Sequence, residues 1–163
     1  MTPEEAGLLH EGLLIAAAHL RGDNSEEERL LQLFLSVERF SRLADAFVYV
    51  ALVAADTRAT SMGIPFPQVL RSITPRTDVI LLAGLPVGPW DEALLLASAV
   101  KRSGDEARRI PLSMDVPSAI NVTFRLAVSA LTELTMTPRF ERMTPESLAD
   151  MFAMGIEQGH ANG

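Results

Sequence analysis

A group of polar residues in the middle of the chain has the composition of a small binding site. Asp56 and Arg58 end a strongly apolar stretch, and Arg71 and Arg76 follow on either side of a proline. Guanidinium groups recognise carboxylates and phosphates through paired, charge-assisted hydrogen bonds. These four residues therefore predict a site for a small anionic ligand, either for sensing or for catalysis, if the fold brings them together.

Arg58 is the most informative member because of its place in an apolar pattern. Leu30, Val37, Ala44 and Ala51 recur every seven residues, and Arg58 takes the next position of the same series. A charged side chain on a core-facing stripe needs a partner, since an unpaired buried charge is costly. The partner is either a ligand anion or an Asp or Glu of another element, and the second is the simpler interpretation.

Other kinds of chemistry find little support in the residue pattern. The chain has no cysteine, no glycine-rich phosphate loop and no G-x-S-x-G motif. His10-Glu11 begins an H-E-x-x-H pattern, but Leu14 stands where the second histidine is needed, and Glu157-x-x-His160 occurs only once. We therefore expect no metal and no cofactor, and the pattern favours a protein that is not an enzyme.

Composition narrows the partners. The 163 residues carry 14 basic and 21 acidic side chains, which give a formal net charge of −7. Nucleic acid and anionic lipid select basic surfaces, so neither is expected as a partner. The longest apolar run, Phe47 to Ala55, is too short to span a membrane, and the start of the chain is acidic where a secretory signal is basic. These features predict a cytoplasmic protein.

Helix signals dominate the first part of the chain. Thr2, Pro3 and Glu5 form a capping-box pattern for a first helix that Gly22 ends. Ser25 opens a second capping box, and no glycine or proline follows between residues 26 and 62. We therefore expect one long helix over 26–62, apolar on all sides across 47–55 and consequently buried there.

The second part of the chain is less regular. Prolines 65 and 67 end the long helix. Further helices are expected over 90–102, over 118–134 and from Thr144, with single short helical turns at 68–73 and 105–109 and with residues 159–163 as a flexible tail. Segment 118–134 fits both an alternating pattern and a helical stripe. Its length favours a helix. If 78–83 and 120–128 instead pair as strands, the fold is α+β.

Four methionines, Met136, Met143, Met151 and Met154, lie near the C-terminus. Methionine fills irregular cores and is also common on adaptable binding surfaces. We interpret this group as core filling, with a groove for a partner as the alternative.

The sequence thus predicts an all-α protein, a single-domain bundle of five or six helices over residues 1–163. The predicted function is a non-catalytic interaction or regulatory module that binds a protein partner or self-associates as a homo-oligomer. The alternative is a small-molecule site for an anion around Arg58, with Asp56, Arg71 and Arg76.

Overall fold

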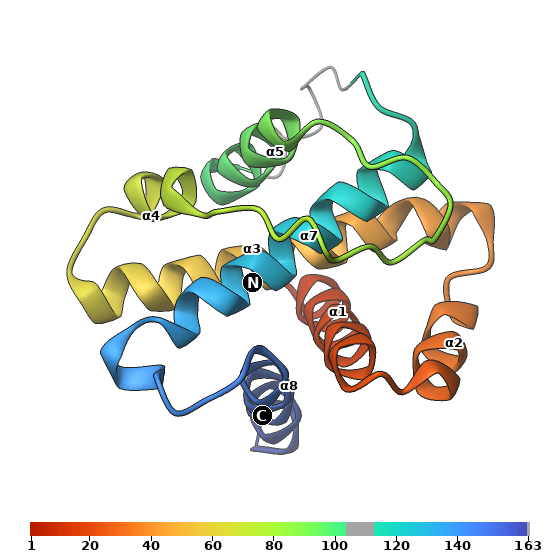
Figure 1. Cartoon of the computed structure of the whole chain (residues 1–163). Coiled ribbons are helices and arrows are strands. Elements are labelled where there is room, and N and C mark those ends of the chain that lie inside the picture. The colour runs from red at the N-terminus through yellow and green to blue at the C-terminus, as the bar shows by residue number, and fades with distance from the viewer. Residues whose placement is uncertain (104–112, 163) are drawn as a thin grey trace.

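The computed structural model describes residues 1–103 and 113–162, and every regular element in them is a helix (Figure 1). Within these two ranges the seven α-helices and one short 3-10 helix are α1 (Pro3–Arg21), α2 (Asn24–Gln32), α3 (Val37–Met62), α4 (Phe66–Ser72), α5 (Trp90–Arg102), α7 (Val116–Thr135), η1 (Pro138–Phe140) and α8 (Pro145–Asn162). The all-helical class is therefore confirmed. In the described part of the chain no helix combines the length and apolarity that a membrane span requires.

Helices α3 and α7 run side by side through the centre of the molecule, with α7 in front in Figure 1. Phe47 of α3 meets Phe124 of α7 edge-to-face, with ring centroids 5.0 Å apart, and both side chains are fully buried. Helix α1 packs on α3, and α8 packs on α1. Helices α4 and α5 cover the opposite side of this central pair. The apolar stretch 47–55 is helical and largely buried, as its composition predicted.

The first helix begins and ends where local signals placed it. The hydroxyl of Thr2 accepts a hydrogen bond from the Glu5 amide, and the Glu5 carboxylate accepts one from the Thr2 amide. At the other end Gly22 adopts a left-handed conformation with φ of 72°, which only glycine reaches without strain. The capping box and the glycine stop are both confirmed.

The single long helix expected over 26–62 is wrong. The chain leaves helical geometry after α2, and Ser36 caps α3 by accepting a hydrogen bond from the Arg39 amide at 3.2 Å. Residue Asp23, and not Ser25, caps α2. The turn between the helices buries Phe34 in the core, where its side chain is only 1% exposed. The heptad pattern does not reveal this turn, because the apolar residues keep the same spacing on both sides of it.

The remaining boundaries explain why the helix count exceeds the five or six expected. The break before Ser36 divides one predicted helix into two, and the segment expected at 68–73 is a separate helix, α4, that begins at Phe66. Segment 118–134 lies within α7, so the helical interpretation is confirmed and the strand alternative for 120–128 is wrong. Residues 78–83 form neither helix nor strand. Helix α8 continues to Asn162, beyond the predicted start of the tail, and 105–109 lies outside the described residues.

A long connection, residues 73–89, joins α4 to α5 and crosses the front of α7 in Figure 1. We call it the strap. It runs antiparallel to α7, because Thr74 bonds to Glu133 near the end of that helix and Gly88 bonds to Ser118 near its beginning. The strap is therefore a layer of irregular chain laid on the central helix.

Two glycines of α1 give opposite expectations for the same substitution. A Cβ at Gly12 would lie 3.0 Å from the Ala46 carbonyl oxygen and 3.1 Å from a methyl group of Val50, whereas a Cβ at Gly7 would meet nothing within 4 Å. We expect Gly12→Ala to lower the free energy of unfolding by about 1–2 kcal/mol because it pushes α1 away from α3. Gly7→Ala should raise it by about 0.5–1 kcal/mol through helix propensity alone. Urea denaturation of both variants checks the difference in sign.

Candidate functional site

The four residues predicted to bind one small anion, Asp56, Arg58, Arg71 and Arg76, do not lie together in the structure. Arg58 donates to Glu133 of α7 at 2.5 Å, and the two side chains are only 17% and 14% exposed. Glu133 also accepts a hydrogen bond from the amide of Thr74 at 3.1 Å. The Arg58 charge thus has a protein partner, the simpler of the two interpretations that the sequence allowed.

Arg76 lies in the strap, where both its backbone amide and its guanidinium group form hydrogen bonds. Its amide donates to the hydroxyl of Ser129 at 2.9 Å, and its guanidinium bonds to Asp78 at 2.7 Å and to Thr132 at 3.2 Å. The hydrogen bond from this guanidinium lowers the pKa of Asp78 below its ordinary value. Arg76 therefore fastens the strap to α7.

Polar side chains spaced four residues apart along α7 bind the strap over its whole length. Asn121, Arg125, Ser129 and Glu133 lie on one face of the helix, and each bonds to backbone groups of the strap. This role was not predicted from the sequence. Their regular four-residue spacing along the helix was the available signal, since it indicates one line of polar contacts.

Asp56 lies elsewhere, on the side of α3 that faces α5. Its carboxylate accepts a hydrogen bond from Lys101 at 2.6 Å, and Lys101 also lies 5.1 Å from the ring centre of Phe66. This ion pair borders a hollow of about 320 Å³ between the start of α1, the middle of α3 and the end of α5. Tyr49 and Glu5 line the same hollow, and we call it the Tyr49 hollow.

Arg71 belongs to neither group. It lies exposed on α4, and within the described residues it makes no hydrogen bond or ion pair. The structure therefore brings together none of Arg58, Asp56, Arg71 and Arg76 as a single site.

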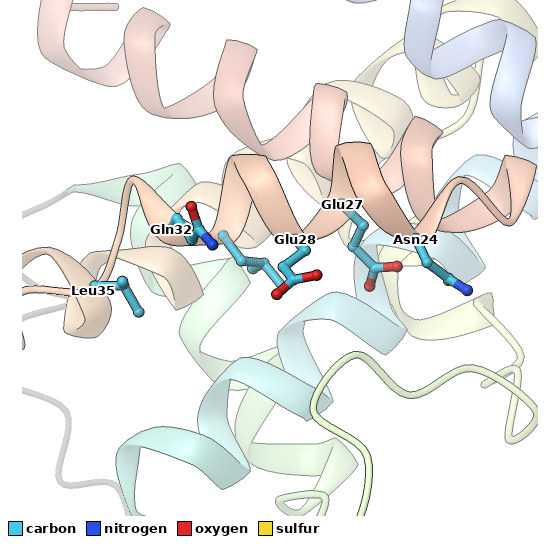
Figure 2. A pocket seen from close by; sticks show the side chains of 6 residues that line it. Asn24, Glu27, Glu28, Gln32 and Leu35 are labelled. Carbon is cyan, nitrogen blue, oxygen red and sulfur yellow. The ribbon is translucent and has the colours of Figure 1, made fainter.

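A second hollow follows one face of α2, and Figure 2 shows its side chains on a common side of that helix. Leu31 and Leu35 supply its apolar surface, and Leu35 is 76% exposed. Glu27 and Glu28 add two carboxylates, of which Glu27 bonds to His19 at 2.9 Å. This surface is shallow and acidic.

The outward face of α8 is a third exposed surface, and it is nearly uncharged. Met151 and Met154 are 39% and 55% exposed, and they border a shallow hollow of about 470 Å³ with Gly155. Of the six residues that line this hollow, only Asp150 is charged, and it is bound by Arg21 of α1 at 2.9 Å. The interpretation of the methionines as core filling is wrong for these two and for Met136, which is 66% exposed.

The two described histidine side chains each bond to one carboxylate. His10 lies 2.8 Å from Glu157 of α8, and His19 bonds to Glu27 and meets the ring of Phe124 edge-on. In the ranges that the structure describes, no three His, Asp or Glu side chains come close enough to hold a metal ion. These contacts connect α1 to its neighbours.

Comparison with protein-family models, with curated proteins and with solved structures finds no match for this chain. Its function is therefore inferred from its own surfaces.

Proposed function

We propose that the chain is a single-domain helical bundle that acts in the cytoplasm as a non-catalytic interaction module, and that it self-associates through the outward face of α8. The observation that carries the proposal is the exposed pair Met151 and Met154 on a face with one, already paired, charge. Exposed apolar surface of this kind is typical of protein contacts, and methionine adapts to the partner that covers it.

Charge supports a second copy of this chain as the partner. Two molecules of net charge −7 repel one another, so they associate most easily where the surface is locally neutral. The face around Met154 meets this condition, whereas the hollow on α2 presents Glu27 and Glu28.

The shape of α8 also suits such a contact. The helix has 18 residues and is therefore about 27 Å long. A Cβ at Gly155 would meet nothing within 4 Å, so a second helix can approach the backbone closely at that point. We expect two copies of α8 to pack across this face, with neighbouring side chains extending the buried area toward the about 1,000 Å² that a specific interface needs.

A double substitution on this face tests the proposal. We expect the wild type to show a concentration-dependent mass above 17.7 kDa by light scattering, and Met151→Glu/Met154→Glu to be a monomer because four carboxylates would face one another in the dimer. Its melting temperature should also lose the concentration dependence of the wild type.

Leu95→Glu provides the matched control, because Leu95 is 49% exposed on α5, away from the proposed interface. This variant should associate as the wild type does. A wild type that stays monomeric up to high concentration, or a Leu95→Glu variant that dissociates equally, would contradict the proposal.

The alternative function, a small anionic ligand at Arg58, has less support. A competing anion would have to displace Glu133 from a bond of 2.5 Å, and Asp56 lies in a different environment beside Lys101. A thermal-shift screen of the wild type and Arg58→Ala with small anionic metabolites distinguishes the two functions, because only a ligand site predicts stabilisation of the wild type alone.

A further inference from the structure

The Tyr49 hollow has the layout of a small-molecule site. Three helices meet there, and Leu52, Val53 and Val100 provide apolar walls. Its volume of about 320 Å³ lies at the lower end of the range of about 300–1,000 Å³ that small-molecule pockets occupy. A few polar groups on an apolar wall are what fixes the orientation of a ligand in such pockets.

Tyr49 offers a hydrogen-bonding group that the protein leaves unused. Within the described residues its hydroxyl makes no hydrogen bond, although the side chain is half-buried. Burial raises the pKa of this hydroxyl, and the negative charges of Glu5 and Asp45 raise it further. The tyrosine therefore stays neutral and can both donate and accept a hydrogen bond.

Asp56 has capacity for a second cation. Only its Oδ2 atom bonds to Lys101, and both side chains are more than 40% exposed, so the ion pair is a weak one that solvent screens. Glu5 adds a second carboxylate to the lining, and it also accepts the capping hydrogen bond from the Thr2 amide.

We propose that the Tyr49 hollow binds a small amphipathic amine. Its apolar body packs on Leu52, Val53 and Val100, and its ammonium group bonds to Asp56 and to the Tyr49 hydroxyl. This site is separate from the α8 face. It prefers a positively charged ligand, whereas the site predicted around Arg58 prefers a negatively charged one.

Tryptamine and indole-3-propionate form a matched pair of probes, because they share the indole body and differ in the charge of the side chain. We expect tryptamine to shift the amide signals of Tyr49, Asp56 and Val100 in ¹H–¹⁵N spectra of the whole chain, with saturation in the millimolar range or below. Indole-3-propionate should bind at least tenfold more weakly. Equal binding of the two probes, or no binding of tryptamine, would overturn the proposal.

Three variants assign the contacts. Tyr49→Phe keeps the ring and should weaken tryptamine binding about three- to tenfold, which is the value of one hydrogen bond. Asp56→Asn should weaken it at least tenfold. Lys101→Met removes the competing ammonium group, so it should tighten tryptamine binding.

Leu35→Ala, at an exposed residue between α2 and α3 that does not line the Tyr49 hollow, is the control and should leave the tryptamine affinity unchanged. Lys101→Met is expected to increase the affinity for tryptamine. Damage to the fold would lower that affinity, so it cannot produce the results expected for all three variants. A loss of binding in Lys101→Met, or an unchanged affinity in Asp56→Asn, would show that the ammonium group does not bind to Asp56.

Discussion

Replacing Asn121 by leucine should lower the free energy of unfolding by about 3 kcal/mol and release the middle of the strap from α7. The Asn121 side chain is fully buried, and its oxygen accepts a hydrogen bond from the Leu82 amide at 2.8 Å. Its amide group donates to the carbonyl oxygens of Leu82, Leu85 and Pro86 at 3.0–3.2 Å. Leucine has a similar size but can make none of these bonds, so it leaves several backbone groups of the strap unpaired.

Urea denaturation measures this loss, and hydrogen exchange locates it. The amide of Leu82 should lose its protection in Asn121→Leu before the central helices α3 and α7 do, because strap and helix then open separately. Asn121→Asp should be at least as damaging, since a carboxylate would face three carbonyl oxygens.

Thr123→Val is the matched control for Asn121. Thr123 is also fully buried on α7, but its hydroxyl bonds only to the carbonyls of Ala119 and Ile120 in the same helix. Removing that hydroxyl should cost under about 1 kcal/mol because the carbonyls keep their bonds within the helix. Equal losses for Thr123→Val and Asn121→Leu would mean that the strap contacts do not contribute to stability.

Removing the carboxylate of Glu133 should cost about 2–3 kcal/mol, the second largest effect that we expect. Glu133→Ala leaves Arg58, only 17% exposed, without its partner, and it also removes the acceptor of the Thr74 amide. An ion pair that is largely shielded from water is costly to break from one side, because the remaining charge stays poorly solvated.

The double variant Arg58→Met/Glu133→Leu separates the cost of an unpaired charge from the worth of the pair. Apolar side chains of similar size leave no charge behind, so this variant should be more stable than Glu133→Ala, with a coupling energy of about 1–3 kcal/mol. Asp150→Ala breaks the exposed pair with Arg21 and should cost under about 1 kcal/mol. Additive losses in the Arg58–Glu133 cycle would contradict a direct interaction.

The contacts of Asn121 with the strap and the ion pair between Arg58 and Glu133 both limit which side chains remain for binding. Two side chains that resembled components of a site in the sequence instead hold the fold together, because Arg58 joins α3 to α7 and Arg76 joins the strap to α7. The polar side chains of α7 therefore stabilise the fold, and the surfaces that we propose for binding are the α8 face and the Tyr49 hollow. This division of roles is why the α8 face lies outside the predicted cluster and why the Tyr49 hollow uses only Asp56 of it.

Met151 and Met154 are exposed, contrary to the prediction that they fill the core, because burial depends on tertiary packing. Their positions in the sequence fit either the inner or the outer side of the last helix, because Leu148, Ala149 and Ala153 alternate with them along α8. Which side faces inward depends on where α1 lies, and no local pattern carries that information. Asp56 is comparable, since its partner Lys101 lies 45 positions further along the chain.

The sequence alone determined the features that depend on neighbouring residues. The capping box at Thr2, the left-handed stop at Gly22 and the helical period of 118–134 involve hydrogen bonds and side chains within a few positions of one another, so composition and spacing predict them. The tertiary structure decided the break before Ser36, the bond between Arg58 and Glu133 and the attachment of the strap. These depend on how helices far apart in the chain pack against each other, because burial and pairing of a side chain are set by its neighbours in space.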